Sequence, residues 1–166
     1  RPKQIGYFSF TKKAATEAAD RAAEKFGLDK ENDLPFFRTL HSYAFNQLGM
    51  TKEKMMKIED YKEFGQKCGI PIKTAKYSAE DGTFNSDNEY LTIINTAAVK
   101  RMDLLEYYDS RKNIIDIERN TLFLLAEELH RFKKEKNLKD FNDLIEDFIK
   151  KETLNKFEVL FIDEAQ

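Results

Sequence analysis

The first 49 residues alternate between segments typical of strands and segments typical of helices, and this order constrains the fold more than any other feature. Residues 5–10 form a short aromatic run that is typical of a buried strand. Thr11 follows as a good N-cap, because its hydroxyl can accept amide protons of the first helical turn. We predict a helix over residues 12–26, ended by the left-handed conformation that Gly27 supplies.

The same pair of segments is then repeated. Residues 36–40 predict a second strand, and a short helix follows that ends near Gly49. Its cap is either Thr39 or Ser42. The order strand, helix, strand, helix is typical of a parallel α/β sheet. The first helix also carries pairs of alanines four residues apart, so one face has no bulk and can lie close to such a sheet.

Residues 50–139 predict a mainly helical region with few strand signals. We expect helices over residues 58–68, 88–108 and 116–136, and a loop over residues 69–88. The last of these helices has apolar residues at intervals of three and four, which is the spacing of one buried face. They are Leu122, Leu125, Leu129 and Phe132.

The C-terminal part of the sequence returns to α/β signals. Asp140 can cap a helix with an apolar stripe made of Phe141, Leu144, Ile145, Phe148 and Ile149. Residues 157–162 are β-prone, and the continuous apolar run within them predicts a central parallel strand covered on both faces. We therefore expect an α/β core that is interrupted by a helical insertion of about 90 residues.

Bulk charge and the rare residue types exclude several classes of protein. Lys and Arg number 28 and Asp and Glu 30, so the net charge is −2 and predicts no strong nonspecific affinity for nucleic acid. Any such binding must come from a local arrangement of charges. One Cys and two His exclude a disulfide framework and a zinc site with several Cys or His ligands. No apolar run approaches the length of a transmembrane helix.

Two adjacent carboxylates, Asp163 and Glu164, directly follow the last predicted strand. Ligands of open α/β sheets bind at the carboxyl ends of the strands. One carboxylate at that place can hold Mg²⁺, and the second can orient and deprotonate an attacking water. The alternative interpretation is an ordinary solvated turn.

Two further junctions between a predicted strand and a predicted helix carry polar side chains. Residues 9–15 place an aromatic ring, two hydroxyls and two lysines at a helix N-terminus, where free amides favour phosphate oxygens. Phe10 offers a face on which a base can stack, or else it belongs to the core while the lysines face water. The second junction places Thr39, His41 and Ser42 where they can donate to phosphates or sugars, although a lone His often makes only a structural hydrogen bond.

Three other polar features have structural interpretations. We predict that His130 is a surface residue and that Cys68 is a small, partly buried side chain. Residues 131–136 are interpreted as a solvated helix end, with a contact to a DNA backbone as the alternative.

Four segments, taken in order, resemble the UvrD/Rep-like family of superfamily 1 DNA helicases. Residues 9–15, S-F-T-K-K-A-A, are similar to the family's motif Ia, commonly T-F-T-N-K-A-A. Residues 39–42, T-L-H-S, are similar to motif Ib, commonly T-F-H-S. Residues 140–144, D-F-N-D-L, are similar to the D-F-D-D-L segment that precedes motif II. Residues 159–166, V-L-F-I-D-E-A-Q, are similar to motif II itself, the Walker B strand with D-E-x-Q.

The resemblance implies a fold of the α/β class. A partial RecA-like parallel sheet of the P-loop NTPase type would be interrupted by a mainly α-helical insertion domain. Residues 1–49 would form the first part of the core, with motifs Ia and Ib. Residues 50–139 would form the insertion domain, and residues 140–166 the second part of the core, with the Walker B strand.

The resemblance also implies roles for single residues. Asp163 would serve Mg²⁺, Glu164 would activate the hydrolytic water, and Gln166 would couple the nucleotide state to DNA. Lys12 stands where the family commonly has Asn, which keeps a phosphate contact but not a specific amide hydrogen bond. The residues implied to grip single-stranded DNA are Ser9, Phe10, Thr11, Lys12, Thr39, His41 and Ser42.

The P-loop pattern G-x-x-x-x-G-K-[ST] occurs nowhere in the sequence, so nothing in it can cradle the β- and γ-phosphates of ATP. The family places that loop before motif Ia, hence before Arg1, and places the arginines that complete the ATP site in a second lobe, after Gln166. We therefore expect a central piece of a larger motor, which does not hydrolyse ATP by itself.

The implied parent protein is an ATP-dependent DNA helicase that translocates on single-stranded DNA and unwinds duplex, with ATP and Mg²⁺ as cofactors. Its partners would be single-stranded DNA, junctions of single- and double-stranded DNA, and the remainder of the helicase chain, but no membrane. We expect a cytoplasmic protein of bacterial or viral origin. The alternatives are the helicase part of a helicase–nuclease subunit, a non-catalytic DNA-binding module derived from a helicase lobe, and a helical interaction domain with chance motif matches.

Overall fold

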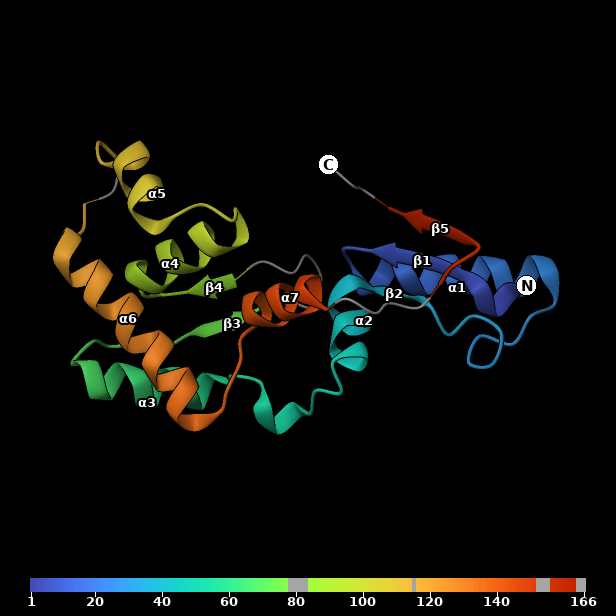
Figure 1. The fold of residues 1–166 in the computed structure, drawn as a ribbon, viewed down its shortest axis with the longest axis horizontal. Coiled ribbons are helices and arrows are strands. Elements are labelled where there is room, and N and C mark those ends of the chain that lie inside the picture. Colours follow the sequence, from blue (N-terminus) through green and yellow to red (C-terminus); the bar gives the residue numbers. More distant parts are fainter. Residues whose placement is uncertain (78–83, 115, 152–155, 164–166) are drawn as a thin grey trace. The chain divides into compact units, whose positions relative to one another are not determined.

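Contacts along the chain divide it into two units. The structure, a computed structural model, describes residues 1–77, 84–114, 116–151 and 156–163. Unit 1 contains Arg1–Met50 and the described residues from Leu144 onward, and unit 2 contains the described residues between Thr51 and Asp143. The boundary falls inside one helix, α7 (Phe141–Lys150) (Figure 1). Within the described ranges no helix combines the length and the apolar character that crossing a membrane requires.

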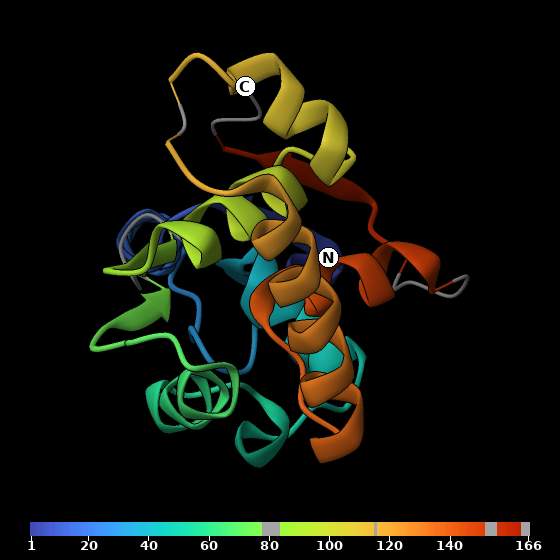
Figure 2. The ribbon, with the colours of Figure 1, turned by 90° about the vertical axis from the view of Figure 1, so that its left-hand side faces the viewer.

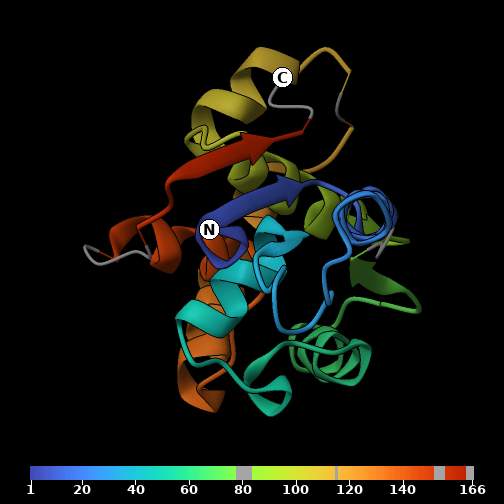
Figure 3. The ribbon, with the colours of Figure 1, turned by 90° about the vertical axis from the view of Figure 1, so that its right-hand side faces the viewer.

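Unit 1 is built on a parallel three-stranded sheet. Strand β1 (Ile5–Ser9) lies between β2 (Phe37–Thr39) and β5 (Val159–Ile162), as Figure 3 shows. Tyr7 of β1 pairs with Phe37 on one side and with Phe161 on the other. The unit therefore has the expected α/β character, and its strands come from three separate parts of the sequence.

Helix α1 (Lys12–Phe26) has the predicted bounds. Thr11 Oγ1 accepts a 3.1 Å hydrogen bond from the amide three residues further on, which is the expected N-cap. Gly27 ends the helix in the left-handed region, at a φ of 63°. Ala15 and Ala19 are buried, and because they carry only a methyl group the helix lies close to β1 and β2.

Aromatic rings form the core of unit 1. Tyr43, from α2 (Leu40–Gln47), is 2% exposed, and its ring centroid lies 4.6 Å from that of Phe8 and 5.5 Å from that of Phe148 in α7. The ring of Phe157 lies 5.9 Å from the same centroid. Such ring pairs contribute stability beyond the apolar area that they bury. They attach α2 and α7 to the face of the sheet on which Phe8 lies.

Strand β5 differs from its prediction as a covered central strand. All four of its side chains are exposed, with fractions from 45% for Val159 to 61% for Ile162. Among the described residues β5 pairs only with β1, so it lies at an edge of the sheet. An apolar run allows both faces of a strand to be buried, but whether they are buried depends on which other elements pack against the strand. In α7, Ile149 is also exposed although the predicted apolar stripe included it.

Unit 2 consists mostly of helices. Helix α3 (Ile58–Cys68), with the predicted bounds, packs against α6 (Arg119–Lys136) (Figure 2). Phe64 of α3 is fully buried, and its ring centroid lies 5.8 Å from that of Phe132 in α6. The predicted apolar face of α6 is buried along its whole length. The described residues also include two 3₁₀ turns, η1 (Pro2–Gln4) in unit 1 and η2 (Lys52–Lys54) in unit 2.

A β-hairpin lies in the segment that was predicted as a loop. Strands β3 (Ala75–Tyr77) and β4 (Phe84–Ser86) pair in antiparallel fashion. Asp87 closes the open end of the hairpin, because its Oδ1 accepts hydrogen bonds from the amides of Lys73 (3.0 Å) and Thr74 (2.8 Å). The prediction failed because a strand of three residues is too short to show alternation between apolar and polar side chains.

The single long helix predicted over residues 88–108 is also wrong. Helix α4 (Glu89–Val99) ends just before Arg101, which has a φ of 52°, and α5 (Leu104–Arg111) starts anew. Asp103 caps α5 by accepting hydrogen bonds from two first-turn amides, at 2.9 and 3.3 Å. A left-handed arginine has no signature in the sequence, because this conformation is unfavourable for any residue with a Cβ atom.

Gly65 provides a test of the packing in unit 2. A Cβ atom at this position would lie 2.7 Å from the carbonyl oxygen of Ile70 and 3.0 Å from a methyl group of Ile72. In an open helix, Gly→Ala stabilises by about 1 kcal/mol. Here we expect Gly65→Ala to lower the free energy of unfolding by about 1–3 kcal/mol, because a backbone oxygen cannot move aside cheaply. Urea unfolding of this variant and of Gln66→Ala, an exposed position in the same helix, measures the difference. Equal stability of the two variants would contradict the packing described.

Candidate functional site

The carboxyl ends of the three parallel strands of unit 1 meet at one edge of the sheet. Ser9, the last residue of β1, pairs with Thr39, the last residue of β2. On the other side Phe8 pairs with Ile162, and the amide of Asp163 donates a 2.8 Å hydrogen bond to the carbonyl of Phe8. The segments that follow these strands, which contain the predicted DNA-binding and metal residues, therefore lie along the same edge.

The junction between β1 and α1 exposes an aromatic ring. Ser9 is only 5% exposed, and its Oγ accepts a 3.2 Å hydrogen bond from the amide of Thr11. Ser9 and Thr11 thus both use a hydroxyl oxygen to hold the turn, which leaves the proton of each hydroxyl as a possible donor. Phe10 between them is 59% exposed, so it does not belong to the core.

Two cations stand at the N-terminus of α1. Lys12 and Lys13 are exposed, and the first turn of the helix contains no acidic residue. No ion pair to either lysine occurs among the described residues. Cations at this end oppose the helix dipole, which costs roughly 0.3–1 kcal/mol at a surface. The ammonium groups and the unpaired amides of the first turn together favour an anion such as a phosphate.

The junction between β2 and α2 contains the second set of predicted residues. Thr39 caps α2, because its Oγ1 accepts a 3.2 Å hydrogen bond from the amide of Ser42, whose own side chain is exposed. Burial lowers the pKa of the His41 imidazole below its ordinary value of 6.5, so the ring is neutral at pH 7.

Asp163 is half-buried at the end of β5. The predicted catalytic residues Glu164 and Gln166 lie outside the described residues. Nowhere in the described ranges do three or more His, Cys, Asp or Glu side chains gather as a metal site. Asp163 supplies one carboxylate of the kind that Mg²⁺ takes in proteins, where one or two carboxylates hold the ion and water and substrate phosphates fill its other positions.

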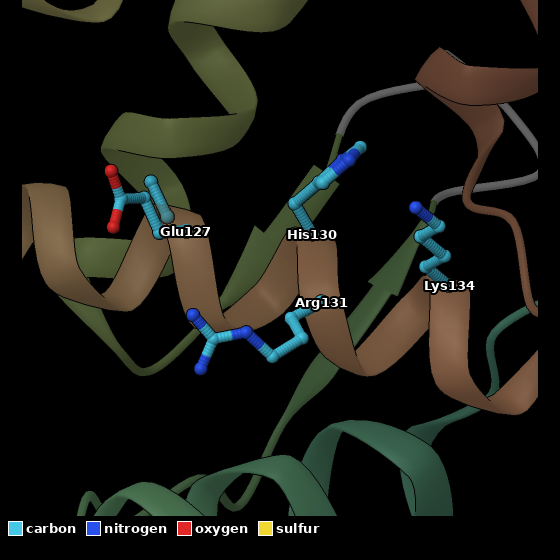
Figure 4. Close-up of a pocket in the computed structure, with 5 residues that line it drawn as sticks. Glu127, His130, Arg131 and Lys134 are labelled. Carbon is cyan, nitrogen blue, oxygen red and sulfur yellow. The ribbon is translucent and has the colours of Figure 1, made fainter.

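A hollow of about 540 Å³ lies on α6 in unit 2, and its charged lining residues are Glu127, His130, Arg131 and Lys134. His130 and Lys134 project to the same side of the helix, and Arg131 projects to the other (Figure 4). Arg131 forms a 2.5 Å ion pair with Glu128. These side chains are exposed, as predicted for His130 and for a solvated helix end. Cys68 is half-buried, also as predicted.

All 166 residues of the chain match one protein family, described as the UvrD/REP helicase N-terminal domain. The chain belongs to this UvrD/REP helicase family. Comparison with curated proteins and with solved structures gave no match. Membership confirms the resemblance drawn from the four motif-like segments, while the role of each site residue stays a prediction.

The buried position of one charged residue in this UvrD/REP domain was not predicted from the sequence. Lys133 was included in the solvated helix end, yet its side chain is only 13% exposed and pairs with Asp140 and Asp143. The available signal was weak: Lys133 lies four residues after Leu129 on α6 and thus next to its buried face. Its two partners belong to the D-F-N-D-L segment, to which the sequence assigned no contact.

The imidazole of His41 predicts a pH dependence of stability for the UvrD/REP domain. Because its pKa is lower in the folded state, the unfolded state binds more protons below about pH 6.5. The contribution of the neutral His41 imidazole to the free energy of unfolding is thus fully present above that pH and is lost as the pH falls. We expect urea unfolding to show a larger loss of stability between about pH 7.5 and about pH 5.5 for the native chain than for His41→Gln. His130→Gln, at an exposed position, is the control and should behave like the native chain; a native slope in His41→Gln would refute the assignment.

Proposed function

We propose that this chain is part of an ATP-dependent DNA helicase that translocates along single-stranded DNA and unwinds duplex. The observation that carries the proposal is the alignment of three strand ends. Their parallel register puts Phe10, Thr39 and Asp163 along one edge of the sheet. In a motor protein the nucleotide site and the DNA-binding site must share one rigid support, so that a structural change at the nucleotide site can move the DNA-binding site.

DNA would be held by stacking together with phosphate contacts. The exposed ring of Phe10 offers a face to a base without selecting its sequence. Lys12 and Lys13 and the amides beside them would bind the backbone phosphate next to that base. Thr11, Thr39, His41 and Ser42 would donate hydrogen bonds along the same strand. Ser9 is buried, so its part is to shape the turn that presents Phe10.

The nucleotide site would be completed by the remainder of the helicase chain. Asp163 would hold Mg²⁺, which when bound neutralises charge on the phosphates of ATP. Glu164 would orient and deprotonate the attacking water, and Gln166 would sense the nucleotide state. The chain has no phosphate-binding loop of the pattern G-x-x-x-x-G-K-[ST], so we assign that part of the site to another segment of the parent protein.

The proposed DNA-binding site can be tested on this chain. We expect Phe10→Ala to weaken binding of a fluorescein-labelled oligothymidylate by about tenfold, because the lost stacking contributes about 1–3 kcal/mol per base. Fluorescence anisotropy at low salt measures the affinity. Phe26→Ala is the matched control, because Phe26 is an exposed phenylalanine beside a lysine at the opposite end of α1. An equal affinity of the two variants would remove Phe10 from the proposed site.

The motor activity needs a longer protein that contains this chain together with a phosphate-binding loop. In that protein we expect Asp163→Asn to lower the rate of DNA-stimulated ATP hydrolysis by about 100-fold or more, because the ligand of the metal is lost. Phosphate release and unwinding of a tailed duplex are the measurements. Binding of single-stranded DNA should persist, and Asp109→Asn, at an exposed position on α5, should be fully active. Unimpaired hydrolysis in Asp163→Asn would refute the role given to this carboxylate.

A further inference from the structure

One cation of unit 1 lies on the strand that leads into the second junction. Arg38 is the middle residue of β2 and directly precedes Thr39, which caps α2. In the parallel register Arg38 pairs with Phe8 of β1, so its side chain starts on the same face of the sheet as that ring. Tyr43 packs on Phe8 from this side. Arg38 therefore carries a positive charge beside the aromatic core, one residue before the edge of the sheet.

The guanidinium of Arg38 has no ion-pair partner within the described residues of unit 1. Its Nε is buried without a hydrogen-bond partner, but the residue as a whole is half-buried, so part of the side chain can be reached from solvent. A buried donor without an acceptor lowers the stability of a folded chain, and an arginine keeps its charge throughout the pH range of proteins. The ion pairs found in unit 1 belong to other cations, namely the N-terminal amine, Arg21, Lys30 and Lys150.

Side chains that suit a nucleic-acid strand lie along the same edge. Phe10, which follows β1, is 59% exposed, and Leu40, which follows β2, is 39% exposed. The residues before them, Ser9 and Thr39, pair with each other, so both apolar side chains belong to this edge. Lys12 adds an exposed cation. Single-stranded nucleic acid binds such surfaces with its bases on apolar groups and its phosphates on cations.

Arg38 differs from the two lysines of the first junction in the phosphate contact that it can make. A guanidinium presents several N–H donors in one plane and can bind two oxygens of one phosphate, whereas an ammonium acts as a point charge. A side chain that is already held in place also loses less conformational freedom on binding. The burial of Nε holds Arg38 in this way, while Lys12 and Lys13 are exposed. Arg38 is thus suited to fix the position of one phosphate.

We propose that Arg38 binds one backbone phosphate of single-stranded DNA at the end of β2. The phosphate oxygens would accept hydrogen bonds from the guanidinium and supply the anion that the described part of unit 1 does not. The inference rests on the proposed function and deepens it, because it adds a phosphate contact that lies outside the segments similar to motifs Ia and Ib.

The salt dependence of DNA binding tests the proposal. For a single strand, each phosphate contact contributes about −0.7 to the slope of the logarithm of the binding constant against the logarithm of the salt concentration. We expect Arg38→Met, which keeps a long apolar stem, to make this slope shallower by about 0.7. It should also weaken binding of a fluorescein-labelled oligothymidylate by about tenfold at low salt, since hydrogen bonds to a charged group are lost.

Two further variants show whether the effect belongs to this position and to its charge. Arg21→Met is the matched control, because Arg21 is an exposed arginine in the second half of α1, and it should leave slope and affinity unchanged. Arg38→Lys should keep the native slope but bind about threefold more weakly, because the planar donors are lost. Equal effects of Arg21→Met and Arg38→Met would overturn the proposal, and so would a slope in Arg38→Lys as shallow as in Arg38→Met.

Urea unfolding of the free chain separates binding from folding. Because Nε of Arg38 lacks an acceptor, Arg38→Met should be at least as stable as the native chain. A clear loss of stability, or a variant that does not fold, would overturn the proposal, because Arg38 would then have its partner within the chain.

Phe10→Ala distinguishes failure of this inference from failure of the proposed function. If Phe10→Ala weakens binding while Arg38→Met keeps the native slope and affinity, only the role of Arg38 is refuted. If the native chain does not bind the oligothymidylate even at low salt, the proposed DNA-binding site is refuted and the role of Arg38 with it.

Discussion

The pairing of β1 with a parallel strand on each side is the interaction on which the rest of unit 1 depends. Parallel strands end at the same edge, so this one arrangement gathers residues near positions 10, 40 and 163 that are far apart in the sequence. Interactions between residues that are close in the sequence could not bring these three positions together. The face of β1 that carries Phe8 also anchors the aromatic core, so the edge has a rigid support.

Local capping then decides what the edge presents. The hydroxyls of Thr11 and Thr39 start α1 and α2 immediately after their strands, which places two helix N-termini at the edge. Lys12 and Lys13 add cations where the helix dipole disfavours them. These two cations slightly lower the stability of the free chain, and the binding of an anion would offset that loss. The chain as a whole is nearly neutral, so these two lysines are a local feature of the edge rather than a result of bulk charge.

How far the sequence predicted the structure differs between its parts for physical reasons. Helices α1 and α3 have the predicted bounds, because their starts and ends are set by neighbours in the chain, such as Thr11, Gly27 and Gly69. The break at Arg101 was missed because a left-handed arginine has no signature in the sequence, and the hairpin was missed because its strands are too short to show alternation. Phe10 and Asp163 were proposed as site residues from motif and strand signals, and their roles stay predictions. The burial of Lys133 was not predicted, because its partners are separated from it by a turn.

By itself, the sequence determined the alternation of strands and helices, the capped starts of α1 and α2, and the family to which the chain belongs. These features follow from side chains and backbone groups within one or two helical turns of each other. Only the tertiary structure decided that β5 lies exposed at an edge, that Phe10 points to solvent, and that Lys133 joins two carboxylates. Exposure and ion pairing depend on which distant segments approach, and no periodicity in a single chain encodes that.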